Sequence, residues 1–217
     1  MRVHIGRPRA LLIVAPHPDD EAIAAHALIT RLARRGTRVA VLVVSDGAAS
    51  HPDSRAWPRA RLVRERRRET RLAMRRIGVA ADAVAFLDLP DGHLADHETA
   101  VCRGIRRAVD ALPTPLLALA PLPVDAHPDH RVVAAAVRRK PGVRWWRYPV
   151  WPAGQRLGGA RMMPLSAQER LAKRHAIRGY RTQAGRITDD PGGFAMTARQ
   201  IAAFSRPREL FAVATAR

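Results

Sequence analysis

The chain has one cysteine, Cys102, among 217 residues. A single cysteine excludes both a disulfide framework within the chain and a thiolate zinc cluster. No apolar run approaches the roughly 20 residues that a membrane-spanning helix needs. The first ten residues are basic, but the apolar run that follows them is short and ends in charged residues, unlike a secretory leader. These absences predict a cytoplasmic protein with no membrane span.

Lysine and aromatic residues are also scarce, whereas arginine is abundant. Lysine and arginine together number 38 against 19 acidic residues, giving a formal net charge of +19, yet only Lys140 and Lys173 are lysines. Such a charge is typical of proteins that bind nucleic acid or anionic surfaces. The arginines are scattered over several predicted helices, however, and form one dense block at 61–76. We therefore expect a solvated arginine-rich surface and no nucleic-acid partner.

Apolar strand-like runs alternate with segments of helical periodicity along most of the chain. The pattern predicts strands at 11–16, 39–44, 83–87, 116–120, 146–150 and 210–214, helices at 18–35, 59–77, 98–111, 131–139 and 166–182, and loops at 45–58, 149–164 and 189–193. This alternation predicts an α/β fold with a doubly wound, mostly parallel sheet and helices on both faces. Gly36 and Gly78 fit positions just after a helix C-terminus. The length and the lack of repeats indicate one domain over residues 1–217.

Histidine and acidic residues follow two of the predicted strands. The run 11–15 leads into Pro16-His17-Pro18-Asp19-Asp20-Glu21, and the run 116–121 is followed a few residues later by Asp125-Ala126-His127-Pro128-Asp129-His130. Ligands in open α/β sheets bind at the carboxyl ends of the strands. Two strand ends with these side chains therefore indicate one site built from both.

A divalent metal is the expected occupant of this site. With Pro18 in the first turn of a helix, the three acidic residues at 19–21 fall in the same turn, and their mutual repulsion is costly unless a cation relieves it. His17 and Asp20 converge across the turn, and His130 completes a His-Asp-His set. Three nitrogen or oxygen ligands with an open position are typical of catalytic zinc, although ferrous iron or cobalt fits the same ligands.

Two further residues complete a hydrolytic site. The metal lowers the pKa of water and polarises a carbonyl. Asp19 adjoins a ligand without having to be one, which makes it the natural general base. His127 lies one turn from His130, where it can protonate a leaving group or stabilise an oxyanion.

These motifs resemble the signature of the PIG-L/LmbE-like N-deacetylases, in the segments 16–21 and 127–130. The resemblance implies a Rossmann-like fold and zinc-dependent removal of an acyl group, usually acetyl, from an amino sugar such as N-acetylglucosamine or from a glycoconjugate. By the family pattern, the metal ligands are His17, Asp20 and His130. Asp19 is then the general base, and His127 is the electrostatic and acid partner.

Softer resemblances extend to about residue 211. The Arg66-x-x-Glu69 helix resembles the family helix whose arginine reaches the substrate. The 89–92 loop resembles the loop whose aspartate, here Asp91, contacts sugar hydroxyls. The chain departs from the family where it has Tyr180-Arg181-Thr182-Gln183 in place of His-x-Ser-Gln. These departures leave the identity of the small-molecule substrate open. The sequence does not identify the oligomeric state either.

Three alternatives remain at this stage. The first keeps the amide hydrolysis but changes the substrate to a thiol conjugate. The second is a non-haem iron oxygenase, which shares the two-histidine, one-carboxylate triad but leaves Asp19 without a role. The third is a basic, metal-stabilised binding module without catalysis. We expect most of the aromatic residues between Trp145 and Trp151 to lie in the core, with Trp151 a candidate to stack on a sugar ring. We expect His51 to lie in a loop.

Overall fold

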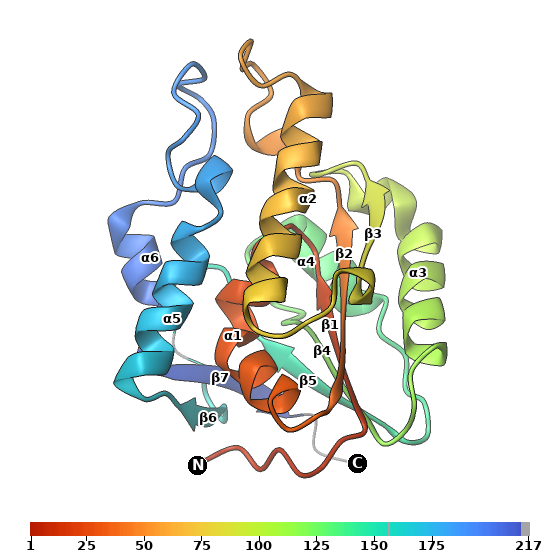
Figure 1. The fold of residues 1–217 in the computed structure, drawn as a ribbon. Helices are drawn as coiled ribbons and strands as arrows, with labels where there is room; N and C mark the ends of the chain where they lie inside the picture. The colour runs from red at the N-terminus through yellow and green to blue at the C-terminus, as the bar shows by residue number, and fades with distance from the viewer. Residues whose placement is uncertain (156, 214–217) are drawn as a thin grey trace.

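The computed structural model describes residues 1–155 and 157–213. One seven-stranded sheet, in the order β3-β2-β1-β4-β5-β7-β6, forms the centre of the molecule (Figure 1). Its strands are β1 (Ala10–Ala15), β2 (Arg38–Ser45), β3 (Val84–Leu89), β4 (Leu116–Pro121), β5 (Val143–Tyr148), β6 (Arg161–Pro164) and β7 (Arg208–Val213). In this order the first five strands, β3, β2, β1, β4 and β5, pair in parallel. Strand β7 pairs antiparallel with both β5 and β6, which completes the sheet. The predicted doubly wound, mostly parallel sheet is confirmed.

Helices cover both faces of the sheet, as predicted. The α-helices are α1 (Asp20–Ala33), α2 (Arg59–Arg76), α3 (Glu98–Asp110), α4 (Pro128–Ala135), α5 (Ala167–Arg178) and α6 (Ala198–Phe204). Short 3-10 turns are η1 (Ala48–Ser50), η2 (Ala81–Ala83), η3 (Leu94–His97) and η4 (Arg181–Gln183). Alternate residues of β1 enter two separate cores. Leu11 and Ile13 pack with α1 and α5, whereas Leu12 and Val14 pack with α3 and α4.

Several predicted boundaries are wrong, and the first has a local cause. The first helix begins at Asp20 rather than at residue 18, because Asp19 is its N-cap with φ of 140° and so cannot continue a helix. The predicted 166–182 helix ends at Arg178, where η4 follows. Strand β6 lies inside the predicted 149–164 loop, and α6 has no predicted counterpart. The last predicted strand extends to residue 214, which lies outside the described residues.

The pairing of β1 with β4 determines where the site lies. These two strands are parallel neighbours, with Ala10 opposite Leu116 and Ile13 opposite Leu119. Their carboxyl ends therefore meet at one edge of the sheet, where both sequence motifs begin. In the described part of the chain, no helix combines the length and apolar character needed to cross a membrane.

Candidate functional site

A pocket of about 330 Å³ opens at the carboxyl ends of β1 and β4. Its wall combines polar and charged side chains with apolar ones. Its lining includes His17, Asp19, Asp20, Ile23, Ser50, Arg66, Asp91, His127, Trp151, Gln183, Phe194 and Met196. The pocket thus contains six of the seven site residues that the sequence predicts, and the seventh, His130, contacts two of them.

The predicted metal ligands form a compact triangle. Nδ1 of His17 lies 3.4 Å from Oδ2 of Asp20 and 3.2 Å from Nε2 of His130, and the same Asp20 oxygen lies 3.2 Å from that Nε2. Ligand atoms about 2.0–2.1 Å from a tetrahedral zinc ion stand about 3.3–3.4 Å apart. All three side chains are buried. The donor set and its spacing therefore fit one divalent metal.

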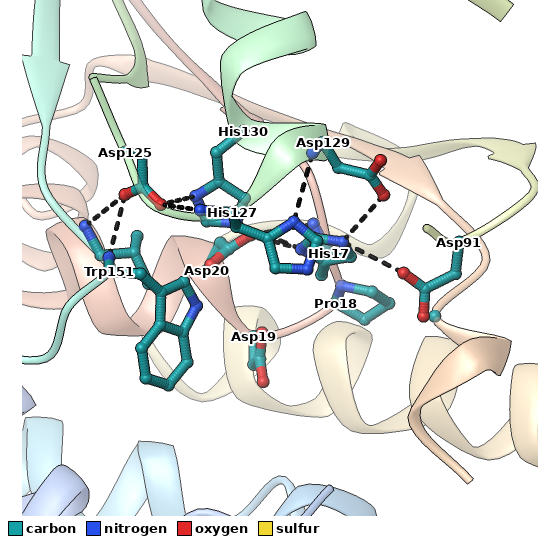
Figure 2. A network of polar contacts seen from close by, with 12 residues as sticks. His17, Pro18, Asp19, Asp20, Asp91, Asp125, His127, Asp129, His130 and Trp151 are labelled. Atoms are coloured by element: carbon teal, nitrogen blue, oxygen red, sulfur yellow. Dashed lines mark hydrogen bonds and ion pairs between the residues drawn. The ribbon is translucent and has the colours of Figure 1, made fainter. Parts of the chain in front are cut away.

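A carboxylate behind His17 fixes which ring nitrogen faces this triangle. Nε2 of His17 lies 3.2 Å from Oδ2 of Asp129 and 3.1 Å from Oδ1 of Asp91. Asp129 also accepts hydrogen bonds from the backbone N–H groups of Gly92, at 2.8 Å, and Leu94, at 3.2 Å, which hold it as an acceptor. Nε2 of His17 therefore carries the proton, and the Nδ1 lone pair is left for a metal. Figure 2 shows His17 between these carboxylates and His130.

Asp125 supports the other histidine ligand. Its Oδ1 lies 3.4 Å from Nδ1 of His130, an ion-pair contact rather than a well-formed hydrogen bond, and accepts the N–H of His127 at 3.0 Å. Its Oδ2 accepts the N–H groups of Val150, at 3.1 Å, and Trp151, at 2.9 Å. One carboxylate therefore links the candidate metal centre to Trp151, which lines the pocket.

Charge within the triangle shifts the pKa of each group. Burial alone raises the pKa of Asp20, but the charge and hydrogen bond of His130 and those of His17 outweigh it, so the pKa is lowered. Burial lowers the pKa of His17, yet Asp129, Asp20 and Asp91 raise it well above its ordinary value. Negative charge is thus concentrated where a cation would bind.

Two further triples of ligand atoms lie within 4.8 Å of one another. One joins His17 and His130 to His127, and the other joins His17 to Asp91 and Asp129. In the second triple, the carboxylates face the protonated Nε2 of His17. The His17-Asp20-His130 triangle uses the other ring nitrogen of His17, Nδ1, so it is the better candidate.

Asp19 is the N-cap residue of α1 and has an unusual backbone conformation. Residues other than glycine rarely adopt its backbone φ of 140°. Burial raises the pKa of its carboxyl to about 8, although the Arg66 guanidinium opposes this shift. A cation beside Asp19 would lower that pKa and favour the carboxylate, which is the form that accepts a proton.

The ring of His127 has a defined proton position. His127 is the N-cap of α4, and its Nδ1 accepts the backbone N–H of Asp129 at 3.2 Å. Burial, followed by the charges on His17 and His130, lowers its pKa to about 4. A ring that accepts at Nδ1 carries its proton on Nε2. His127 is therefore a neutral N–H donor beside the triangle at neutral pH.

The two predicted substrate contacts have strong protein partners. The guanidinium of Arg66 donates to the backbone oxygens of Gly47 and Pro18. Oδ2 of Asp91 accepts the N–H of Ala49 at 3.0 Å, while its Oδ1 faces His17. Their contact with substrate stays a prediction.

Sequence reasoning assigned no role to several residues that build the site. Asp125 and Asp129 were visible as acids inside the second motif, and their roles follow from the geometry alone. Gln183 lies in the 180–183 segment that departs from the family pattern, and its Nε2 donates to Oγ of Ser50 at 3.1 Å. His51 is buried in the expected loop, where its ring packs against the backbone of Gly193.

Comparison with known families identifies the fold and the motifs together. The family model described as "PIG-L: GlcNAc-PI de-N-acetylase" matches residues 12–140, which include both histidine-rich motifs. The chain belongs to the PIG-L family. The resemblance drawn from the sequence is confirmed, and PIG-L is a family of deacetylases.

One curated PIG-L relative matches part of the chain at moderate sequence identity. The 2'-N-acetylparomamine deacetylase of Streptomyces fradiae is 33% identical over 152 residues, which cover 64% of this chain and 54% of that protein. The chain thus spans about half the length of the curated relative that it matches.

Solved PIG-L structures match over a larger share of the chain. The N,N'-diacetylchitobiose deacetylase of Pyrococcus horikoshii superposes with a TM-score of 0.68 at 22% identity, covering 95% of this chain and 84% of that one. A deacetylase triple mutant from the teicoplanin biosynthetic pathway superposes with a TM-score of 0.63 at 26% identity, covering 79% and 81%. These likenesses confirm the α/β fold.

Proposed function

We propose that this chain is a metal-dependent amide hydrolase that removes an N-acyl group, acetyl first of all, from an amino sugar or glycoconjugate. The observation that carries the proposal is the buried triangle of His17, Asp20 and His130, with Asp19 and His127 beside it in one pocket. The names of the relatives support it, because paromamine, chitobiose and teicoplanin deacetylases are described by this reaction. The proposal treats residues 1–217 as one domain that acts on a small molecule.

His17, Asp20 and His130 would hold the metal through Nδ1, Oδ2 and Nε2. Zinc fits the two nitrogens and one carboxylate best, and ferrous iron or cobalt would accept the same set. A divalent metal in such a site lowers the pKa of water and polarises the carbonyl of the bound amide.

The chain's own residues supply the proton transfers. Asp19, as carboxylate, takes a proton from the attacking water while a new C–O bond forms at the acyl carbon. The Nε2–H of His127 donates to the carbonyl oxygen as negative charge develops there. When the C–N bond breaks, the proton held by Asp19 passes to the departing nitrogen, leaving a carboxylic acid and a free amine.

The neutral state of His127 favours one of the two roles that the sequence left open. An imidazole that accepts a backbone N–H at Nδ1 has one proton, at Nε2, and its lowered pKa keeps it so. We therefore assign His127 to stabilising the oxyanion and give the leaving-group proton to Asp19.

Acetate release tests the proposal directly. Wild type and Asp19→Asn, both loaded with zinc, are compared on N-acetylglucosaminides with different aglycones. We expect release by wild type and a loss of turnover of about 10²–10⁴-fold in Asp19→Asn, because the amide cannot accept the proton. Zinc content should be equal in the two proteins.

Two outcomes would contradict the proposal. An Asp19→Asn protein with full zinc and full activity would remove Asp19 from the mechanism. A wild type that binds zinc stoichiometrically but releases no acetate from any aglycone would move the search to other amides, thiol conjugates first.

A further inference from the structure

The backbone around Asp19 is held from three sides. Its own carbonyl accepts the N–H groups of Ala22 and Ile23, each at 3.0 Å, which starts α1. Its N–H donates to Oε2 of Glu21 at 3.2 Å. The peptide in front of it is held by Arg66, whose Nη2 donates to the carbonyl of Pro18 at 2.8 Å. A residue with φ of 140° persists only where its surroundings impose that conformation.

Arg66 joins two strand ends. Its Nη1 donates to the carbonyl of Gly47 at 2.7 Å, so one guanidinium connects the loop after β2 to the turn after β1. The side chain is 3% exposed and comes from the middle of α2. Its Nη2 also lies 3.7 Å from Oδ2 of Asp19. A planar fork that bridges two carbonyls fixes both distance and angle, which a lysine ammonium does not.

Gly47 makes room for this fork. A Cβ at position 47 would lie 2.5 Å from Nη1 and 2.7 Å from Cζ of Arg66. The guanidinium is therefore packed against the Gly47 backbone as well as bonded to it. Any side chain at position 47 would push the fork away from Pro18.

We propose that Arg66 is a positioning residue, which clamps the Pro18–Asp19 peptide and so aims the Asp19 carboxylate at the reacting centre. This inference rests on the proposed function, because it assigns Arg66 to holding the base rather than to gripping the sugar. Its hydrogen bonds to the carbonyls of Gly47 and Pro18 hold protein backbone and not substrate.

The kinetic test separates holding from gripping. Zinc-loaded Arg66→Lys and Arg66→Ala are assayed on the substrate that wild type cleaves best. If Arg66 positions Asp19, kcat falls about 100-fold, as a displacement of about 1 Å costs, while KM stays within about threefold. Guanidinium ion added to Arg66→Ala should restore part of kcat. A rise in KM with unchanged kcat would overturn the proposal, because it is the signature of uniform substrate binding.

Three variants act as matched comparisons. Arg67→Lys changes the neighbouring arginine, which pairs with Asp88 instead, and should leave both constants unchanged. Gly47→Ala keeps Arg66 but displaces its guanidinium, and should lower kcat as Arg66→Lys does. Gly36→Ala controls for the left-handed backbone alone, since Gly36 has a φ of +75° with open space around it. Equal activity in Gly47→Ala and Gly36→Ala would contradict the clamp.

A structural readout keeps the inference independent of the reaction. Crystal structures of wild type and Gly47→Ala should show a positive φ at Asp19 in the first and its loss in the second. A φ near 140° in both would overturn the clamp even if the kinetics agreed. A wild type without deacetylase activity would contradict the proposed function only, and this structural comparison would still decide the role of Arg66.

Discussion

At the scale of single residues, the carboxylate of Asp129 orients the ring of His17. Asp129 precedes the candidate ligand His130 in sequence, yet its carboxylate contacts His17, 112 residues away. The backbone N–H groups of Gly92 and Leu94 hold it in that position. The orientation of His17 thus depends on a residue that follows the neighbouring strand β4 and on the loop after β3.

Replacing Asp129 should weaken metal binding without removing a ligand. In Asp129→Asn, the side-chain amide can accept the Nε2–H of His17 through one atom only, and a turn of the amide places N–H against N–H. We expect zinc affinity to fall about 10–100-fold, the usual effect of losing such a supporting contact. Competition with a chelator measures it.

Asp96→Asn is the matched control, since its carboxylate is exposed and pairs with His93, which is not one of the predicted metal ligands. Equal zinc affinities in Asp129→Asn and wild type would show that His17 is oriented without Asp129.

Part of this site was predictable from sequence, and the limit is physical. His17, Asp20 and His130 were identified because parallel strands bring their carboxyl ends to one edge. The partners of Arg66 and Asp129 were not, because they depend on where loops of tens of residues fold back. No spacing in the sequence encodes a guanidinium bonded to the carbonyls of Gly47 and Pro18.

At the scale of elements, α1 is two helical segments rather than one. Ala25 inside it has φ of −144° and ψ of 22°, which interrupts the helical hydrogen bonds. Beyond this break, the N–H groups of Ala27 and Leu28 donate to the carboxylate of Glu209, on β7. The same carboxylate accepts Nζ of Lys173, on α5, at 2.9 Å. Strand β7 therefore caps the second half of the helix that bears Asp20.

Breaking this buried pair should destabilise the fold. Glu209→Leu leaves the Lys173 ammonium unpaired at 2% exposure. We expect a loss of about 3–5 kcal/mol in the free energy of unfolding, the usual cost of one uncompensated buried charge. Denaturant unfolding measures it.

Lys140→Met is the comparison, because Lys140 pairs with Asp110 at the surface, where such pairs contribute about 0–1 kcal/mol. If the two variants lost the same small amount, Glu209 would not be needed to cap α1.

The element predictions failed where elements are short. Strand β6 has four residues and ends in Pro164, and it exists because β7 pairs with it. Helix α6 has seven residues and begins with a capping box formed by Thr197 and Gln200. The T-x-x-Q spacing was a local signal for its start. Longer elements were predicted because their periodicity extends over several turns or a full strand.

At the scale of the whole molecule, stability should depend on pH through His26. This side chain is buried in α1, and burial, followed by the charge of Lys173, lowers its pKa to about 4. The folded protein thus favours the neutral ring, whereas the unfolded chain takes up a proton near pH 6.5. The stabilisation is complete above pH 6.5 and is lost as the pH falls toward 4.

We expect this group to cost wild type about 2 kcal/mol between pH 7 and pH 5. His26→Gln, which cannot ionise, should lose less stability over that interval, as measured by denaturant unfolding at both pH values. His4→Gln changes an exposed histidine and serves as the comparison. Parallel pH curves for His26→Gln and wild type would remove His26 from this dependence.

The contact between Arg66 and Gly47 also has an evolutionary consequence. Because a Cβ at position 47 would overlap the guanidinium, the two positions cannot change independently. A lineage that keeps the arginine must keep the glycine, and one that loses the arginine is free to fill position 47. Among the descendants of one ancestral gene, an arginine at position 66 should therefore occur only together with a glycine at position 47.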